Sequence, residues 1–403
     1  MMTETMKLLG DTLMTLALVT VLCGCRTVDS AARSGDRDDL SRVNVRTFGA
    51  KGDGKTDDAP AIQAAIDACP QAGTVLVPEG HWLVQSSPLR LRSGITLQGH
   101  GQRSVIIRGP KLRTCLAAED ASRLKIERLR FVVTAATPAK MEGRLAHFQH
   151  CREVTVRECE FDGTTTNGLP SQFSLCQFEC CNDVKCLDNR FRNTAGSATG
   201  ATGASWEPEW GRRSEFARNV VEDYCDTGIG LWTGAREAHV HHNRLRGRAE
   251  KFTSYPVGID VDGGTHSLIE HNDIADGHIA IRLYDCHDGA YPMTAIVVRD
   301  NFLHDQRTYD AHHPAWAIKP ENPKSRLEAS IEGNRIVQQD KHASAMTGGG
   351  AGHTILHVNL NEFTGVMFWN FEYYAANALA VFSGGKRVDW RTGIGNNTQK
   401  RPK

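Results

Sequence analysis

The 403-residue sequence has no excess of charge of either sign, because 47 Lys and Arg residues balance 47 Asp and Glu residues. A chain without net charge lacks the long-range attraction by which proteins commonly bind nucleic acids and anionic membranes. We therefore expect no nucleic-acid partner, and recognition of a charged ligand has to come from local groups. The length alone allows one large elongated domain or two to three globular ones.

The sequence also lacks an apolar run long enough to span a bilayer. The run from Leu13 to Leu22 has the length of a signal-peptide core, and the "LCGC" at its end resembles the lipidation site of bacterial lipoproteins. We expect a signal peptide over residues 1–25, lipidation of Cys25 and a linker over residues 26–43. The protein would then be an exported monomer, lipid-anchored in the cell envelope or located in the periplasm or outside the cell, and would contact a membrane through that anchor alone.

What the sequence does contain is a repeat of the form apolar-x-apolar-x-x-Asn-x-apolar. Copies such as "VKCLDNRF", "AHVHHNRL" and "SLIEHNDI" place its Asn at positions 189, 219, 243, 272, 301, 334 and 361. Two earlier copies, "LKIERLRF" and "VTVRECEF", have Leu129 and Cys159 at the Asn position. Successive copies lie 24 to 33 residues apart.

Each copy alternates with period two, breaks the alternation once and resumes it, and the segments between copies allow a third short strand. Three short strands in roughly 25 to 30 residues predict one coil of a right-handed parallel β-helix, whose coils stack about 4.8 Å apart. The Asn side chains would then form a ladder at a bend. Tandem βαβ units are the alternative, but the segments between copies leave no room for ten-residue amphipathic helices.

The repeat also changes the interpretation of the twelve cysteines. In an exported protein, disulfides would be the usual expectation. Here Cys151 and Cys181 take equivalent positions one coil apart, and Cys186 takes the inward-facing position of Val156. We therefore expect most of the cysteines to be free thiols that stack in the core.

Metal-binding patterns are weak. No C-x-x-C pair has a matching second pair, so a structural zinc site is not expected. The pairs His241-His242 and His312-His313 resemble metal ligands, but neighbours on a strand point to opposite faces. We interpret both pairs as solvated surface.

The octapeptide "GAKGDGKT", Gly49 to Thr56, satisfies the phosphate-loop pattern G-x-x-x-x-G-K-[ST]. A phosphate needs an unobstructed helix N-terminus, and here Asp57 and Asp58 occupy the first turn, where they would cap the helix and repel an anion. The following "APAIQAAIDAC" predicts one amphipathic helix, with apolar residues at i, i+3, i+4 and i+7. We therefore do not interpret the octapeptide as a nucleotide site.

The segments "FGAKGDGKTDDAPAIQAAIDAC", "GTVLVPEGHWLV" and "GITLQGHG" closely resemble the N-terminal segment of the pectate-lyase superfamily, which includes rhamnogalacturonase- and polygalacturonase-like enzymes. The resemblance implies an all-β, single-stranded right-handed parallel β-helix with an N-terminal capping α-helix. We expect the cap and first coils over residues 44–109, further coils over 110–365 and a C-terminal cap or tail over 366–403. The same scaffold carries hydrolases, lyases, epimerases and non-catalytic proteins, so it does not decide the reaction.

Outward-facing residues of successive coils form rows about 4.8 Å apart, which suits a groove for a linear polymer. We align the third strands by their inward-facing residues, which places Ile279 beside Ile259 and Ile281 beside Val261. The first outward row then reads Trp232, Asp262, Arg282 and Lys319. The second reads Gly230, Asp260, Ala280 and Ala317, with His278 just before it and Tyr284 one position further.

These rows predict an enzyme that cleaves an acidic, uronate-containing polysaccharide of the pectin type. Asp260 and Asp262 lie about 6.6 Å apart at the backbone, close to the 6.5–9.5 Å, approximately, between the carboxyl groups of inverting glycosidases. His278 could relay a proton, while Arg282 and Lys319 could hold a uronate carboxylate.

Four aromatic residues are predicted to bind the sugar rings. Trp232 and Tyr284 belong to the rows, and Trp206 and Trp210 come from the segment "SWEPEW". Flat apolar ring faces of this kind suit stacking on a sugar. For Trp206 and Trp210, packing within a long loop is the alternative.

The order of the site residues also resembles that of polygalacturonase-like hydrolases, which carry Asn-Thr-Asp, Asp-Asp, Gly-His-Gly and Arg-Ile-Lys on successive coils. Here "CDTG" contains Asp226, "DVD" contains Asp260 and Asp262, "GHI" contains His278 and "AIK" contains Lys319. Each motif is altered and the Asp-Asp pair is split. His278 and Lys319 are the positions that the resemblance carries over most directly.

Two further functions fit the same rows. β-Elimination would use Arg282 or Lys319 as the base, with Asp260 and Asp262 as ligands if the reaction needed Ca²⁺. We expect no other cofactor or metal, and we favour hydrolysis slightly over elimination. In the second alternative, a non-catalytic β-helix binds glycan or forms a surface scaffold, and Asp262, Arg282 and Lys319 make a row of surface ion pairs.

Overall fold

The computed structural model describes most of the chain from residue 41 onward. The described ranges are 41–133, 143–163, 173–204, 207–248, 255–284, 290–309, 314–321, 326–340, 342–347, 354–365, 367–370, 379–383, 386–388 and 397–400. Contacts separate residues 1–39 from residues 40–403, and the second unit contains all the described strands and helices. The predicted signal peptide with Cys25, Trp206 and the His312-His313 pair lie outside the described residues.

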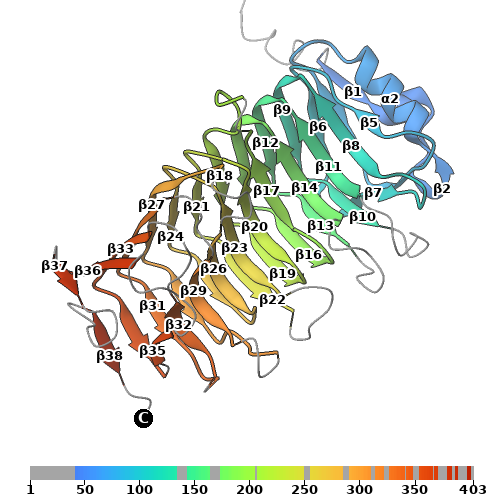
Figure 1. The fold of residues 1–403 in the computed structure, drawn as a ribbon. Coiled ribbons are helices and arrows are strands. Elements are labelled where there is room, and N and C mark those ends of the chain that lie inside the picture. The colour runs from blue at the N-terminus through green and yellow to red at the C-terminus, as the bar shows by residue number, and fades with distance from the viewer. Residues whose placement is uncertain are drawn as a thin grey trace, which may run out of the picture. The chain divides into compact units, whose positions relative to one another are not determined.

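Three sheets make up the fold, and they are confirmed as a parallel β-helix. Successive strands along the chain go to different sheets, and each strand pairs with its equivalent in the neighbouring coil (Figure 1). The described strand pairs are parallel, except that residues 379–383 pair with residues 386–388 in an antiparallel manner. No helix in the described part of the chain is both long and apolar enough to cross a membrane.

The strands stack in order along each of the three sheets. The 14-stranded sheet contains β1 (Arg42–Asn44), β3 (Thr74–Leu76), β6 (Thr96–Gln98), β9 (Ser122–Glu127), β12 (Arg152–Arg157), β15 (Asn182–Leu187), β18 (Ser214–Ala217), β21 (His239–His241), β24 (Leu268–Glu270), β27 (Met293–Arg299), β30 (Leu327–Glu332), β33 (Thr354–Asn359), β36 (Leu379–Ser383) and β37 (Lys386–Val388). The 13-stranded sheet contains β2 (Asp53–Asp57), β4 (Gly80–Val84), β7 (Ser104–Arg108), β10 (Arg130–Val133), β13 (Glu160–Asp162), β16 (Arg190–Thr194), β19 (Val220–Tyr224), β22 (Arg244–Gly247), β25 (Asp273–Ala275), β28 (Phe302–His304), β31 (Arg335–Val337), β34 (Glu362–Thr364) and β38 (Thr398–Lys400). The 11-stranded sheet contains β5 (Leu89–Arg90), β8 (Thr114–Glu119), β11 (Gly143–Gln149), β14 (Phe173–Glu179), β17 (Thr199–Thr202), β20 (Thr227–Trp232), β23 (Val257–Asp262), β26 (Ile279–Tyr284), β29 (Trp316–Glu321), β32 (Ser344–Thr347) and β35 (Met367–Asn370).

The predicted asparagine ladder lies at the corner between the 14-stranded and the 13-stranded sheets. Asn272 is typical: its Nδ2 donates to Asn301 Oδ1 at 3.0 Å and to the carbonyl oxygen of Val240 at 2.9 Å. The ladder joins the seven predicted Asn residues and continues to Asn397, which the repeat pattern did not reveal. Cys159 takes the preceding position, and its backbone N–H donates to Asn189 Oδ1. Buried amide groups are thereby satisfied from coil to coil.

The break in each repeat is a residue with left-handed backbone conformation directly before the ladder position. These residues are Arg128, Glu158, Asp188, Arg218, His242, His271, Asp300, Gly333 and Leu360, with φ between 52° and 61°. A single left-handed residue turns the chain sharply between two extended segments. This turn converts one long alternating pattern into two strands of different sheets.

The interior is filled by stacks of equivalent side chains. Phe131, Phe161 and Phe191 stack with ring centroids 5.0 and 5.1 Å apart. Nine cysteines within the described residues are buried and free, and Cys186 is the register partner of Val156, as predicted. These thiols fill the core as small apolar groups.

At the N-terminal end of the coils lies helix α2 (Ala59–Ala68), preceded by the 3-10 turn η2 (Val45–Phe48); a further 3-10 turn, η3 (Gly101–Arg103), precedes β7 (Figure 1). The buried side chains of α2 belong to the main core, so the helix closes the first coil with its apolar face. An uncovered coil end would leave apolar core and strand edges in water.

Two backbone N–H groups in the middle of the phosphate-loop pattern are already hydrogen-bonded to a side chain of the protein. The two carboxylate oxygens of Asp58 accept the backbone N–H groups of Lys51 and Gly52 at 2.7 and 2.9 Å. Asp58 therefore does not cap α2 with its side chain, and that expectation was wrong; Asp57 accepts the N–H of Ala59 instead. Residues 53–57 form strand β2.

Candidate functional site

The candidate residues lie on four neighbouring strands of the 11-stranded sheet, β20, β23, β26 and β29. One outward row of register partners reads Gly230, Asp260, Arg282 and Lys319. The next row reads Trp232, Asp262, Tyr284 and Glu321. The predicted row of Trp232, Asp262, Arg282 and Lys319 was therefore wrong, although its members are close neighbours.

The error is a shift of two residues between β23 and β26. Val257, rather than Ile259, is the register partner of Ile279. Ile279 belongs to a small separate apolar cluster with Val257 and Trp316, whereas Ala280 and Ile281 both lie in the main core. The alternation of inward and outward residues along β26 breaks at Ala280 and Ile281. A register shift of two residues leaves every apolar residue facing inward, so the apolar pattern could not reveal the shift.

Asp260 and Arg282 form a bidentate ion pair across neighbouring strands. Arg282 Nε lies 2.8 Å from Asp260 Oδ1, and Arg282 Nη2 lies 2.7 Å from Oδ2. Asp260 is buried, and the Arg282 side chain is 24 % exposed. Burial opposes the charge of Arg282, but the attraction and hydrogen bonds of Asp260 outweigh burial and raise the pKa of Arg282. The guanidinium is therefore a fixed cation.

Trp232 and Tyr284 enclose this ion pair. The indole Nε1 of Trp232 donates to Asp260 Oδ2 at 3.2 Å, and the Arg282 guanidinium lies 4.6 Å from the centre of the Tyr284 ring. The Trp232 ring folds back over Gly230 and Gly200, where a Cβ atom would come within 1.8 and 2.5 Å of ring atoms. The two glycines thus provide the space in which the indole lies flat against the sheet.

Lys319 pairs with a residue that sequence reasoning missed. Its Nζ lies 3.0 Å from Oε1 of Glu321, and both side chains are about one-fifth exposed, at 19 % and 23 %. The signal was present in the segment "WAIKPE", because residues two apart on a strand share a face. Glu321 adds a third carboxylate to the rows, beside Asp260 and Asp262.

His278 is buried in a different environment from the ion pair. Its ring lies 4.5 Å from Tyr255 and 5.7 Å from Tyr309, and its Nδ1 lies 3.2 Å from the carbonyl oxygen of Arg307. It precedes Ile279 at the start of β26, whereas Arg282 comes three residues later. His278 and Arg282 are four residues apart along the strand, and with about 3.3 Å per residue they lie about 13 Å apart at the backbone.

Trp210 packs at a corner some coils away. The Arg152 guanidinium lies 4.1 Å from its ring centre, and the ring of His150 lies 5.4 Å away. These contacts are those of the loop-packing alternative, with one ring face already covered by Arg152.

The carboxylate of Asp260 is already engaged by its neighbours. Both oxygens of Asp260 already accept hydrogen bonds, from Arg282 and Trp232. Within the described ranges, no group of three or more His, Cys, Asp or Glu residues is arranged to hold a metal ion. A calcium site built on Asp260 and Asp262 would require the Arg282 ion pair to break.

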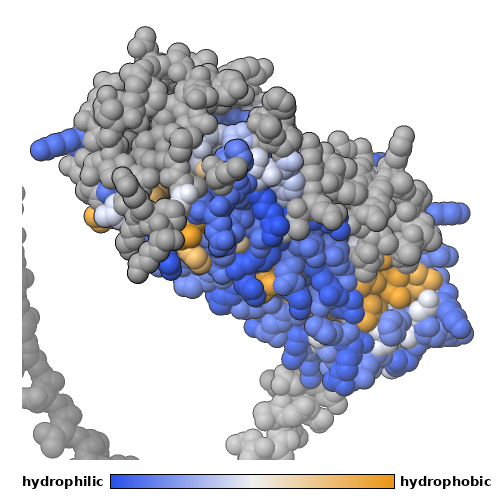
Figure 2. All heavy atoms as spheres, turned by 90° about the horizontal axis from the view of Figure 1, so that it is seen from below, coloured by the Kyte–Doolittle hydropathy of each residue, from blue (hydrophilic) through white to orange (hydrophobic). Residues whose placement is uncertain are grey.

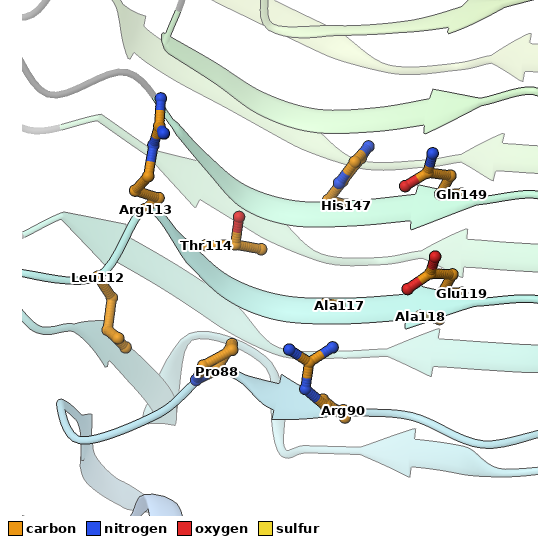
Figure 3. A pocket seen from close by; sticks show the side chains of 10 residues that line it. All are labelled: Pro88, Arg90, Leu112, Arg113, Thr114, Ala117, Ala118, Glu119, His147 and Gln149. Carbon is orange, nitrogen blue, oxygen red and sulfur yellow. The ribbon is translucent and has the colours of Figure 1, made fainter.

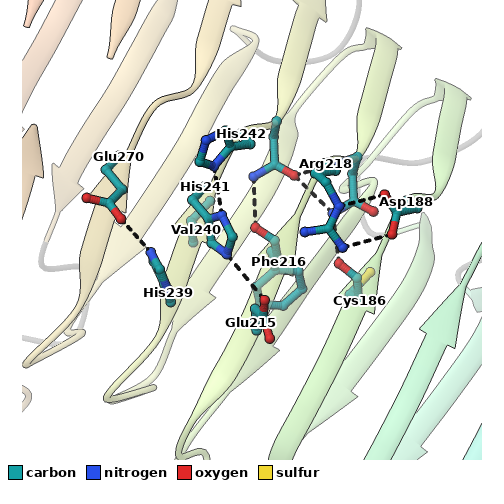
Figure 4. A network of polar contacts seen from close by, with 12 residues as sticks. Cys186, Asp188, Glu215, Phe216, Arg218, His239, Val240, His241, His242 and Glu270 are labelled. Carbon is teal, nitrogen blue, oxygen red and sulfur yellow. Dashed lines mark hydrogen bonds and ion pairs between the residues drawn. The ribbon is translucent and has the colours of Figure 1, made fainter. Parts of the chain in front are cut away.

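The outer face of the 14-stranded sheet and the corner at which its strands end carry a different polar network (Figure 4). Arg218 forms a bidentate pair with Asp188 at 2.7 and 2.8 Å, and His239 lies 2.9 Å from Glu270. His241 and His242, expected on opposite faces, instead approach within 2.9 Å through their Nδ1 atoms, because His242 is one of the left-handed residues. The space-filling view likewise shows that the described surface is mostly hydrophilic on the side it presents (Figure 2).

The family model described as rhamnogalacturonase A/epimerase, pectate lyase-like, matches residues 42–246, which is half of the chain. The chain belongs to this family. Within the pectate lyase-like family, the matching curated relatives are much longer proteins. Alginate lyase 7 of Azotobacter vinelandii is 45 % identical over 73 residues, which cover 16 % of this chain and 8 % of that protein. The whole-protein activities of such relatives therefore do not transfer directly.

Solved structures share the fold of this pectate lyase-like protein. An exopolygalacturonase from Thermotoga maritima matches with a TM-score of 0.59 and 13 % identity, over 86 % of this chain and 92 % of that chain. A surface adhesin of Streptococcus pneumoniae matches with a TM-score of 0.55 and 14 % identity, over 89 % and 90 %. At these identities, the likeness establishes the fold and leaves the reaction to the site.

Proposed function

We propose that the protein cleaves a uronate-containing polysaccharide, by hydrolysis rather than elimination. The observation that supports this most is the pair of cations Arg282 and Lys319, which are register partners and both partly exposed. Two such groups side by side suit a sugar carboxylate, and Trp232 and Tyr284 supply flat ring faces beside them. Relatives named as an alginate lyase and as an exo-poly-α-D-galacturonosidase agree with an acidic substrate.

Hydrolysis needs two carboxyl groups at a suitable separation. Asp260 holds Arg282 in place and is a positioning residue. Asp262 and Glu321 occupy the same outward row on either side of Tyr284. Two strand spacings separate them by about 9.6 Å at the backbone, near the upper end of the range for inverting glycosidases, about 6.5–9.5 Å between carboxyl groups. We assign the acid and base roles to this pair.

Elimination is less well supported. It would need a neutral base near the uronate C5 proton. Arg282 is held charged by Asp260, which raises its pKa, and the Lys319 ammonium is ion-paired with Glu321. Both groups are better placed to bind the carboxylate than to remove a proton.

A panel of polyuronides tests the proposal. The protein is incubated with polygalacturonate, alginate and related polymers, and both new reducing ends and the absorbance of unsaturated uronates are recorded. Reducing ends without absorbance support hydrolysis, and both signals together indicate elimination. The absence of both would favour the non-catalytic alternative, which agrees with the ion-paired state of Arg282 and Lys319 and with the fold of the adhesin.

Site variants test the assignment of residues. Asp262→Asn and Glu321→Gln should each reduce kcat by at least about a hundredfold if they are the acid and base. Lys319→Ala should raise KM more than it lowers kcat, because it removes a substrate contact. Full activity in both Asp262→Asn and Lys319→Ala would show that these two rows do not form the active site.

We further propose that the protein is exported and anchored by a lipid on Cys25, as residues 13–25 suggest. Metabolic labelling with a fatty-acid analogue should label the wild type and not the Cys25→Ala variant. Equal labelling of both would reject the anchor.

A further inference from the structure

A hollow of about 320 Å³ lies on the outer face of the 11-stranded sheet, over β5, β8 and β11 and far from the candidate site (Figure 3). The hollow arises because one residue in a row of large side chains is small. Arg90, Ala117 and His147 are register partners, and the methyl group of Ala117 leaves open the space between the other two side chains. Two strand spacings, about 9.6 Å at the backbone, separate Arg90 from His147.

The hollow is lined by groups that can hold an anionic sugar. Arg90 is exposed, and no acceptor within the described residues is hydrogen-bonded to its guanidinium. His147 is fixed by Glu179, whose Oε2 lies 3.0 Å from its Nε2. Glu119 and Gln149, register partners in the next outward row, lie beside them and can bind hydroxyl groups. Figure 3 shows Arg90, Glu119, His147 and Gln149 around the same space.

The hollow shares its two outward rows with the candidate site. From Ala117 the first row continues through His147, Gln177, Gly200 and Gly230 to Asp260. Five strand spacings of about 4.8 Å give about 24 Å. Between the hollow and the candidate site, Gly200 and Gly230 carry no side chain, and the Trp232 ring lies flat against the sheet. One extended polymer could therefore contact both.

We propose that this hollow is a second binding site for a uronate unit of the polysaccharide, with Arg90 as the partner of the sugar carboxylate. The proposal rests on the proposed function, because it takes the same polymer. A chain that reaches both sites gains affinity through the high local concentration of its second end. The hollow thus selects for longer chains.

Binding of uronate decamers tests the proposal in the full-length protein. Oligogalacturonate and oligomannuronate are titrated by calorimetry into the wild type and into Arg90→Glu and Ala117→Leu. The first variant reverses the charge, and the second fills the hollow with a larger side chain. Each should raise the Kd of the preferred decamer about tenfold, which corresponds to about 1.4 kcal/mol. The loss in Arg90→Glu should shrink at high salt.

Matched controls lie on the outer face of the 14-stranded sheet. Lys125→Glu makes the same change of charge, and Thr155→Leu adds a similar side chain; both outward positions line a different cavity there. Wild-type affinity in these controls, together with the two losses above, supports the proposal. Wild-type affinity in both Arg90→Glu and Ala117→Leu overturns it, as does a loss in Lys125→Glu of equal size.

The outcome is distinct from that of the proposed function. Decamers that bind with dependence on Arg90 but are not cleaved would reject the enzyme and keep the second site. Decamers that are cleaved, with no dependence of binding on Arg90 or Ala117, would reject the second site and keep the enzyme. Thermal unfolding of each variant shows whether a loss reflects the site or the fold.

Discussion

Two regions of the same β-helix, one at a corner of the coils and one on the face of a sheet, use the same kind of ion pair in different surroundings. At the corner where the strands of the 14-stranded sheet end, Arg218 and Asp188 form a bidentate pair whose side chains are 48 % and 43 % exposed. On the 11-stranded sheet, Arg282 and Asp260 form a bidentate pair whose side chains are 24 % and 4 % exposed. An exposed pair contributes little to stability, whereas a pair withdrawn from water is costly to break.

The difference shows how a face with a functional site can be distinguished from a face that only carries charged residues in a repeat protein. Both faces carry charges at strand spacing, so charge rows alone do not mark a site. Buried carboxylates do not mark it either, because Glu270 on the 14-stranded sheet is also buried and paired with Arg299. The 11-stranded face adds an indole that lies on glycines and a cation against a tyrosine ring. Such an arrangement holds its groups in place before a ligand arrives.

The largest expected effect concerns the cation itself. Arg282→Lys keeps the charge but loses the fork that matches Asp260, and kcat/KM on the preferred polyuronide should fall about a hundredfold. Arg218→Lys makes the same change at the corner of the coils and should leave activity within about twofold. Equal effects in both variants would remove the distinction between the two regions.

Removal of Asp260 and removal of Asp188 should differ in their effect on the free energy of unfolding. Asp260→Ala leaves a mostly buried guanidinium unpaired and should lower the free energy of unfolding by about 2 kcal/mol, less than for a fully buried pair because Arg282 is partly exposed. Asp188→Ala should cost less than about 0.5 kcal/mol. Urea unfolding of the two variants in parallel gives the comparison, and a larger loss in Asp188→Ala would contradict it.

A smaller effect is expected at the glycines beneath Trp232. Gly230→Ala places a methyl group where the Trp232 ring lies, so the indole has to move away from Asp260. We expect affinity for the oligouronate to fall about fivefold, an overpacking cost of about 1 kcal/mol at a ring that can shift. Thr155→Ala, on the other charged face, should have no effect on this affinity. An unchanged Kd in Gly230→Ala would mean that the Trp232 ring does not contact the sugar.

The smallest effect concerns pH and the 14-stranded face. Burial, followed by repulsion from His239, lowers the pKa of His241 below its ordinary 6.5, and the attraction of Glu215 does not compensate. As pH falls below 6.5, the unfolded chain takes up this proton before the folded one, so folded-state stability decreases. His241→Gln should therefore flatten the acid side of the stability curve and leave stability above pH 7 nearly unchanged, which urea unfolding at a series of pH values measures. A steeper acid side would contradict this sign.

The fold could be predicted from the sequence because each copy of the repeat has the same types of residue at the same positions. Seven Asn residues, each after a residue that turns the chain, mark the corners of the coils, and these were predicted. The three-strand coil and the buried free cysteines follow from the same pattern. The Asn397 position was missed because its surroundings do not repeat the apolar spacing.

The site was predicted less well, for a physical reason. Inward and outward residues alternate, so a slip of two residues keeps every side chain on its face and costs nothing in the apolar pattern. Ile279 was therefore aligned with Ile259, and Arg282 was placed beside Asp262 instead of Asp260. The break at Ala280 and Ile281 is a feature of packing between coils, which a single strand does not encode.

The asparagine ladder also has a consequence for how such proteins change over time. Because every ladder amide bonds to its neighbours above and below, each coil is held in phase with the next, whatever its own length. Successive ladder positions lie between 24 and 36 residues apart along the chain. Insertions can therefore lengthen one corner without disturbing the alignment of the others, and a new binding group can be added to one coil while the remaining coils keep their places.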